Sequence, residues 1–107
     1  PAATEFRRKV RAAGSRYRVI KNTLDHLRRM ERQALDLIDV CFINLSGLSL
    51  QDDSVLDFIR GELAKNVVPP QKIGFEITET TAVANLSRAL RFIDALRKLG
   101  VESASIA

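Results

Sequence analysis

The sequence is poor in residues that hold covalent or metal frameworks together. It has one cysteine, Cys41, and one histidine, His26, which excludes an intramolecular disulfide and a cysteine-based zinc site. Cys41 stands inside an apolar run, which favours a small buried side chain. His26 lies off the apolar stripe of its expected helix and has no second ligand at helical spacing, which favours a surface residue over a metal ligand.

Long apolar runs are lacking as well. No stretch approaches the ~20 apolar residues of a membrane span, and the N-terminal residues do not form the apolar core of a signal peptide. We therefore expect a soluble, cytoplasmic protein. The 107 residues, 46% of them hydrophobic, suit one small globular domain. They are too few for a complete eight-stranded barrel, which needs roughly 200 residues or more.

Acidic residues are scarce in the first third of the chain. Residues 1–33 carry ten Lys and Arg against three acids, whereas the remainder carries seven against ten. The candidate phosphate-facing residues in this basic segment are Arg7, Arg8, Lys9 and Arg11. The alternative is a solvated helix face. Only Phe6 and Tyr17 interleave the basic residues, so a stacking platform for single-stranded nucleic acid is poorly supplied and nucleic acid is an unlikely partner.

Apolar periodicity predicts an alternation of helices and strands. The first helix is expected over Arg18–Ala34. After a loop at Gly47–Gln51, a second helix is expected to begin at a cap on Asp52 or Asp53, and the two prolines after residue 68 end it.

A third helix is expected from a cap near Thr80, Thr81 or Asn85 up to Gly100, which occupies the usual place after a helix end. Its predicted apolar face consists of Leu86, Ala89, Leu90, Ile93 and Leu96. Two strands, 40–45 and 72–80, lie between the helices, and residues 101–107 begin another. This order implies an α/β fold with a parallel sheet and right-handed crossovers.

Each of the two complete strands places a polar residue near its C-terminal end. Alternation puts Glu76 on the face opposite the apolar side chains of its strand, and it does the same for Asn44. If the strands are parallel neighbours, Asn44 and Glu76 face one common space. Parallel α/β folds keep their functional sites at this end of the sheet.

Amide and carboxylate oxygens are hard ligands that suit Mg²⁺, Mn²⁺ or Ca²⁺. Two such residues are too few for metal-dependent hydrolysis of a phosphodiester. From the pattern alone, Asn44 and Glu76 could equally cap loops, and Glu79 could be an acid that the dipole of the next helix favours.

Several linked segments resemble one protein family. They are Ile43-Asn-Leu-Ser-Gly47, Pro69-Pro70, Phe75-Glu-Ile-Thr-Glu-Thr80, Asn85-Leu-Ser-Arg-Ala-Leu-Arg-Phe-Ile93 and residues 96–100. With these motifs at this spacing, the chain from about Arg18 to Gly100 resembles the middle of an EAL domain, the bacterial cyclic di-GMP phosphodiesterase family.

The resemblance implies a partial (β/α)8 TIM-barrel-like segment. We expect a single partial domain over residues 1–107. Its parts would be a basic N-terminal segment of weaker match at 1–17, the βα units at 18–100, and the start of a further strand at 101–107.

The resemblance also implies roles for individual residues. Asn44 resembles the family's asparagine metal ligand, and Glu76 resembles the glutamate ligand of the following strand. Glu79 resembles a second glutamate that steadies an active-site loop. In the intact family these ligands hold Mg²⁺ or Mn²⁺, which activates water to cut cyclic di-GMP into linear pGpG.

Other motifs of the family are missing from this sequence. The Glu-x-Leu signature would precede Pro1, and the place of the metal-binding Asp-Asp pair falls on Ile106 and Ala107 or beyond them. The chain by itself is therefore expected to be inactive. The alternative is a non-catalytic EAL-like module that binds cyclic di-GMP or a protein partner. Strands cut from a barrel leave uncovered edges, so we also expect self-association or cover by flanking domains.

Overall fold

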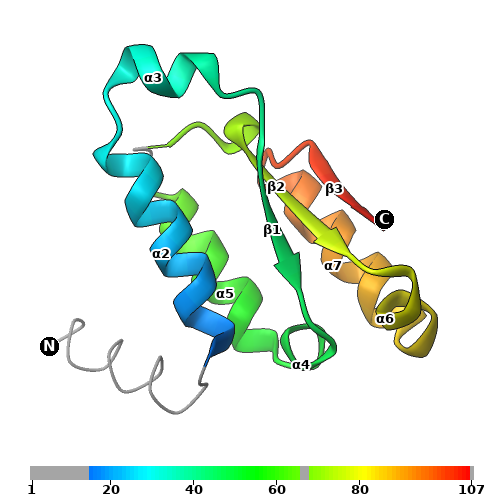
Figure 1. The fold of residues 1–107 in the computed structure, drawn as a ribbon. Helices are drawn as coiled ribbons and strands as arrows, with labels where there is room; N and C mark the ends of the chain where they lie inside the picture. Colours follow the sequence, from blue (N-terminus) through cyan, green and yellow to red (C-terminus); the bar gives the residue numbers. More distant parts are fainter. Residues whose placement is uncertain (1–14, 66–67, 107) are drawn as a thin grey trace, which may run out of the picture.

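The computed structural model describes residues 15–65 and 68–106 (Figure 1). The four candidate phosphate-facing residues, Arg7, Arg8, Lys9 and Arg11, lie outside this range. The elements are α2 (Ser15–Arg29), α3 (Arg32–Leu37), β1 (Cys41–Leu45), α4 (Gly47–Leu50), α5 (Asp53–Leu63), a 3₁₀ turn (Pro70–Lys72), β2 (Ile73–Ile77), α6 (Glu79–Ala84), α7 (Leu86–Lys98) and β3 (Ser103–Ile106). Within the described residues, every helix is too short or too polar to span a membrane.

The three strands form one parallel sheet in the order β1-β2-β3. Helices connect consecutive strands, which is the connection that parallel neighbours require. This confirms the predicted α/β fold with alternating helices and parallel strands.

The two faces of the sheet have different surroundings. Helices α2, α5 and α7 pack behind one face (Figure 1). The strand side chains buried on that face are Ile43, Leu45, Ile73, Phe75, Ile77 and Ala104. On the opposite face Phe42 and Asn44 are exposed and Glu76 is half-buried. The predicted strand alternation is therefore confirmed, and Asn44 and Glu76 lie on the open face.

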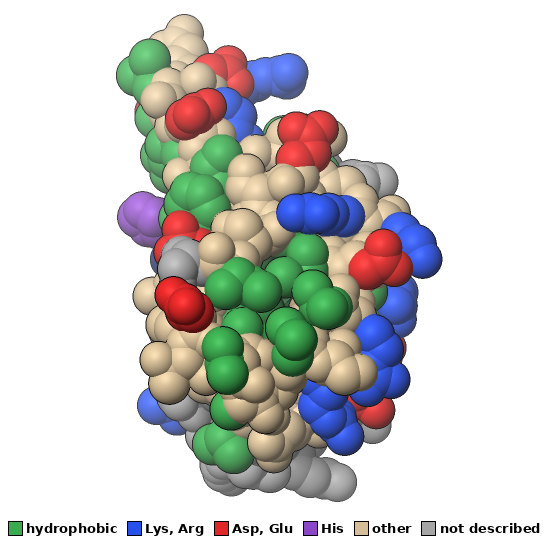
Figure 2. Space-filling model, turned by 90° about the vertical axis from the view of Figure 1, so that its right-hand side faces the viewer, with side chains coloured by type: hydrophobic (Ala, Val, Ile, Leu, Met, Phe, Trp, Pro, Cys, Tyr) green, Lys and Arg blue, Asp and Glu red, His purple; other side chains and the backbone are tan. Residues whose placement is uncertain are grey.

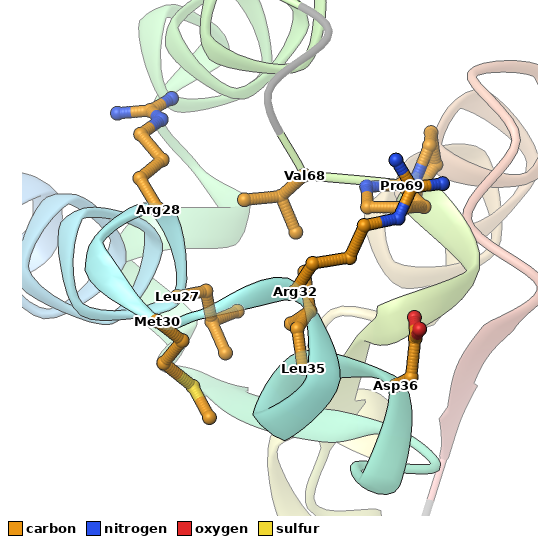
Figure 3. Close-up of a pocket in the computed structure, with 9 residues that line it drawn as sticks. Leu27, Arg28, Met30, Arg32, Leu35, Asp36, Val68 and Pro69 are labelled. Carbon is orange, nitrogen blue, oxygen red and sulfur yellow. The ribbon is translucent and has the colours of Figure 1, made fainter.

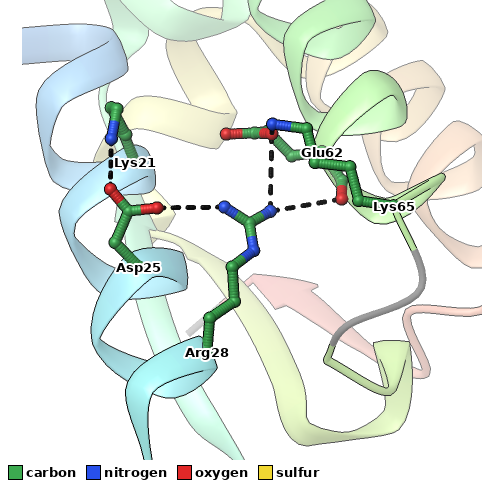
Figure 4. Close-up of polar contacts among 5 residues, drawn as sticks. All are labelled: Lys21, Asp25, Arg28, Glu62 and Lys65. Carbon is green, nitrogen blue, oxygen red and sulfur yellow. Dashed lines mark hydrogen bonds and ion pairs between the residues drawn. The ribbon is translucent and has the colours of Figure 1, made fainter.

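Helices α2 and α5 are joined by apolar and polar contacts. The rings of Tyr17 and Phe58 meet edge to face with centroids 5.0 Å apart, and the Tyr17 hydroxyl hydrogen-bonds Ser54 Oγ. Arg28 contacts Asp25 on its own helix at 3.0 Å and Glu62 on α5 at 3.4 Å (Figure 4). Glu62 is buried, and its charge is compensated by Arg28 and by Lys65.

The first helix is shorter than the sequence predicts. It ends at Arg29, and α3 begins as a separate helix at Arg32. Glu31 interrupts the helical backbone with φ −62° and ψ 146°, and α3 has no fully buried residue to extend the buried face of α2. Ala34, at the predicted end, is exposed. His26 is exposed as predicted, whereas Cys41 is only half-buried.

The segments that leave β1 and β2 also differ from expectation. The predicted loop at Gly47–Gln51 is largely the short helix α4, because Ser46 Oγ accepts a hydrogen bond from the Ser49 amide at 3.2 Å. The predicted third helix is two helices. Thr78 caps α6 by accepting from the Thr81 amide at 3.3 Å, and a break at Asn85 precedes α7.

The buried face of α7 is rotated relative to the predicted stripe. Ala89, Ile93 and Leu96 are buried as expected, together with Phe92, but Leu86 and Leu90 are about half exposed. Figure 2 faces the side of the molecule that carries α7 and β3, and it shows hydrophobic side chains gathered near the centre with Lys and Arg along one border. Gly100 follows the helix with φ +96°, the left-handed conformation that glycine adopts readily.

Candidate functional site

Asn44 and Glu76 are direct neighbours on the open face of the sheet. They are register partners on the parallel strands β1 and β2, and neighbouring strands lie about 4.8 Å apart. Each residue is next to last in its strand, so both side chains leave the sheet at its C-terminal edge. The structure thus brings together the two residues that the sequence predicts as a pair.

A third polar residue continues this row. Ser105 on β3 is the register partner of Glu76, and it is exposed on the same face. We call Asn44, Glu76 and Ser105 the polar row. The sequence alone does not identify Ser105, because the pairing of β3 with β2 is needed to align it with Glu76.

An aromatic ring lies next to the polar row. A Cβ atom added to Gly74 would stand 2.5 Å from Cε1 of Phe42 and 2.9 Å from Cγ1 of Val40. Real Cβ atoms do not approach that closely, so the Phe42 ring lies directly over the Gly74 backbone. Phe42, two residues before Asn44, therefore supplies apolar surface on the open face.

Glu79 is placed just beyond β2. It is the first residue of α6 and is exposed, and its side chain makes no hydrogen bond or ion pair in the described part of the chain. An acid in the first turn of a helix interacts favourably with the helix dipole. This position agrees with the helix-dipole interpretation, and the role of Glu79 in supporting a loop stays a prediction.

The donor atoms of the polar row suit a hard divalent cation, because they are a carboxylate, an amide carbonyl and a hydroxyl. They are too few to complete such a site, since Mg²⁺ takes about six oxygen ligands. Within residues 15–65 and 68–106, no group of three or more His, Cys, Asp or Glu side chains could hold a metal ion. The residues of the polar row can supply some of the ligands of a cation site, but not all of them.

A separate hollow lies at the other end of the strands. It has a volume of about 360 Å³ and lies between the end of α2, helix α3 and the segment before β2 (Figure 3). Leu27, Leu35 and Val68 supply apolar wall, and Arg32 and Asp36 supply charge. Because α3 precedes β1 and Pro70 precedes β2, this hollow is remote from the polar row and does not belong to the candidate site.

Comparisons with known proteins agree with the α/β fold. The "Cyclic di-GMP phosphodiesterase PdeB" of Shewanella oneidensis is 43% identical over 58 residues, which is 54% of this chain and 7% of that protein. A crystal structure of the FimX EAL domain matches with a TM-score of 0.73 and 28% identity, covering 97% of this chain. The FimX EAL domain from Pseudomonas aeruginosa bound to c-di-GMP matches with a TM-score of 0.69 and 26% identity, again over 97% of this chain.

The chain spans only 42% and 41% of the two FimX chains, so its fold is a partial segment of the TIM-barrel-like EAL architecture, as predicted. The profile of the family described as "EAL domain" matches residues 13–104. This match covers most of the sequence, including both strands that carry Asn44 and Glu76. The chain therefore belongs to the EAL domain family.

Proposed function

We propose that this chain forms part of an EAL domain that recognises cyclic di-GMP at the open face of the sheet, with Asn44 and Glu76 among the residues that meet the ligand. The observation that carries the proposal is the direct pairing of Asn44 with Glu76 at the C-terminal edge of a parallel sheet. One of the similar solved structures is a complex with c-di-GMP. EAL phosphodiesterases generally depend on a divalent metal ion.

Asn44 and Glu76 would hold one side of a Mg²⁺ or Mn²⁺ ion through their side-chain oxygens. When bound, such a metal activates water and neutralises phosphate charge. The chain's own contribution is the rigid spacing of the two side chains, because both stand on hydrogen-bonded strands rather than on loops. Phe42 keeps one side of this face apolar, and Glu79 would support the segment after β2.

A non-catalytic role is the second candidate, and Ser105 favours it. The register partner of Glu76 on β3 carries a neutral hydroxyl rather than a carboxylate, so the polar row holds only one negative charge. A face with one carboxylate repels a phosphate less than a face with several. Binding of cyclic di-GMP without cleavage is therefore compatible with the described residues.

Hydrolysis tests the catalytic part of this proposal. We expect no conversion of cyclic di-GMP to pGpG by the 107-residue chain in the presence of Mg²⁺ or Mn²⁺, because Asn44 and Glu76 alone do not complete a metal site. Product formation that disappears in Glu76→Gln would contradict this expectation and would show a working site.

Recognition is tested by NMR titration of the chain with cyclic di-GMP at low and moderate salt. We expect chemical-shift changes at the Asn44 side-chain amide and at the backbone amides around Glu76, and we expect Asn44→Ala to remove the changes at the backbone amides around Glu76. Asn22→Ala, on the exposed side of α2, is the matched control and should leave them unchanged. Shifts confined to basic residues that vanish as salt rises would indicate charge attraction alone and would contradict the proposal.

The assembly and location of the chain belong to the same proposal. The edges of β1 and β3 are not paired within the described residues, and natural proteins cover or pair such edges. We therefore propose that flanking chain or a second copy covers them, and that the domain acts in the bacterial cytoplasm. If the chain is a monomer in sedimentation equilibrium and melts cooperatively, it is stable without such cover, and this proposal is contradicted.

A further inference from the structure

The segments that follow β1 and β2 are connected by side-chain hydrogen bonds beyond the polar row. After β1, Ser46 caps α4 and Gln51 ends it. After β2, Thr78 caps α6, and its hydroxyl donates to Thr81 Oγ1 at 2.9 Å. These two segments flank the edge of the sheet where Asn44 and Glu76 emerge.

Asn85 links the two segments. Its side-chain nitrogen Nδ2 donates to the Thr81 carbonyl at 3.1 Å, and its side-chain oxygen Oδ1 accepts from Gln51 Nε2 at 3.3 Å. A primary amide is suited to this place because it both donates and accepts. The Thr81 carbonyl lies in the last turn of α6, where intrahelical donors run out.

The backbone places Asn85 at the junction of two helices. Its amide donates to the Ala82 carbonyl at 3.1 Å, and its carbonyl accepts from the Ala89 amide at 2.9 Å. Asn85 itself has φ −138° and ψ 44°, outside the helical region. The orientation of α6 relative to α7 is therefore set at this residue.

The start of α4 lies near the same side chain. A Cβ atom added to Gly47 would stand 3.7 Å from Asn85 Nδ2 and 3.8 Å from Thr81 Cγ2. The start of α4 therefore faces the side chains of Asn85 and Thr81, and this proximity does not depend on the bond from Gln51. Two separate observations thus connect Asn85 with α4.

We infer that Asn85 is a positioning residue that couples the segment after Asn44 to the segment after Glu76. By holding α4 and α6 together, it keeps the two flanks of the polar row at a fixed separation. This inference rests on the proposed function for its effect on cyclic di-GMP, but the coupling itself is a property of the free chain. Asn85 touches neither ligand nor metal in this role.

Hydrogen exchange of single amides measures the coupling without ligand. The reporters are the amide of Leu50, bonded to the Ser46 carbonyl at 3.2 Å, and the amide of Ala82, bonded to the Thr78 carbonyl at 2.9 Å. We expect Asn85→Ala to speed exchange at Leu50, and Gln51→Ala to speed exchange at Ala82, each about fivefold, as loss of one net hydrogen bond implies. A purely local capping role would not transmit either effect to the other segment.

The matched controls are Asn22→Ala and Gln71→Ala. Both residues are exposed, and neither side chain has a hydrogen-bond partner among the described residues. Neither control should change exchange at Leu50 or Ala82. If Asn85→Ala and Gln51→Ala each affect only their own segment, or if the controls act equally, the coupling is overturned.

A second experiment measures the dissociation constant of cyclic di-GMP for the unsubstituted chain and for each variant. We expect a weakening of about threefold to tenfold in Asn85→Ala and in Gln51→Ala, and none in the controls. If the unsubstituted chain does not bind cyclic di-GMP, the proposed function fails while the exchange result still decides the coupling. If it binds and both variants bind equally well, the positioning role is overturned even where the exchange result supports the coupling.

Discussion

The two faces of the sheet use the same strands for different purposes. Phe75 on β2 faces the helices and is 1% exposed, whereas Phe42 on β1 faces the open side and is 48% exposed. Phe42 is the register partner of Gly74, the residue just before Phe75 on β2. Because successive side chains of a strand point to opposite faces, Phe42 and Phe75 lie on opposite sides of the sheet. Strand alternation therefore separates a face that stabilises the fold from a face whose polar row is available to a ligand.

The largest expected effect compares phenylalanines on the two faces. Phe75→Ala should lower the free energy of unfolding by about 3–5 kcal/mol, because it opens a cavity in the packed layer. Phe42→Ala should lower it by about 1 kcal/mol, because that ring is half solvated already. Urea unfolding followed by circular dichroism measures both values. Equal losses would show that the open face is covered in solution and that the two faces do not differ in their contribution to stability.

The next largest difference in stability is expected between a glutamate in the helix layer and a glutamate on the open face. Glu62 in the helix layer is 8% exposed and compensates Arg28 and Lys65, so Glu62→Gln should destabilise the chain by about 2 kcal/mol. Glu76 makes no ion pair with any described residue. Glu76→Gln should therefore change stability by no more than about 0.5 kcal/mol. A strongly destabilising Glu76→Gln would assign Glu76 to structure rather than to ligand binding.

The contact between Phe42 and Gly74 gives a smaller effect. Gly74→Ala should cost about 1 kcal/mol, because the new methyl group displaces the ring above it. The same substitution should cost less in a chain that already carries Phe42→Ala. Chemical unfolding of the two single variants and the double variant gives the coupling energy. Strict additivity would mean that the ring does not rest on Gly74 in solution.

The smallest effect concerns pH and the helix layer. Hydrogen bonding from Lys21, with further attraction from Arg28, holds the pKa of Asp25 below its ordinary value of 3.8 against the opposing effect of burial. A carboxyl whose pKa is lowered by folding stabilises the chain above the unfolded pKa, and this contribution is lost as pH falls through the lower folded value. Asp25→Asn should therefore destabilise by up to about 1 kcal/mol at pH 7.

That penalty should shrink as the pH falls below 3.8. Unfolding free energies of both chains at pH 7 and in acid measure the change. A penalty that is the same at both pH values would show that the carboxylate charge of Asp25 contributes nothing.

The sequence predicts those features that depend on the local spacing of apolar and polar residues or on a single residue's backbone preference. Alternation of apolar and polar residues places Asn44 and Glu76 on one face, and the helix stop at Gly100 follows from its own backbone freedom. The cap at Asp52 is likewise local, because its carboxylate accepts from the Ser54 amide at 3.0 Å.

Features that depend on register or on tertiary contacts could not be predicted in the same way. Ser105 joins the polar row only through the pairing of β3 with β2, and Gly74 is explained only by the ring of a neighbouring strand. The link between Gln51 and Asn85 joins residues that are 34 positions apart. Asn85 is one of the three predicted helix starts and is the N-cap of α7. The separate helix α6 before it was not predicted, because residues on both sides of Asn85 favour helix.

The most direct test of the open face as the functional face is paramagnetic broadening by Mn²⁺ in NMR spectra of the chain. Broadening detects weak ion binding, so it suits a face that holds only part of a cation site. We predict that the signals of Asn44 and Glu76 broaden first and that Glu76→Gln abolishes the effect. Broadening centred on other acids, or broadening at Asn44 that survives Glu76→Gln, would contradict it.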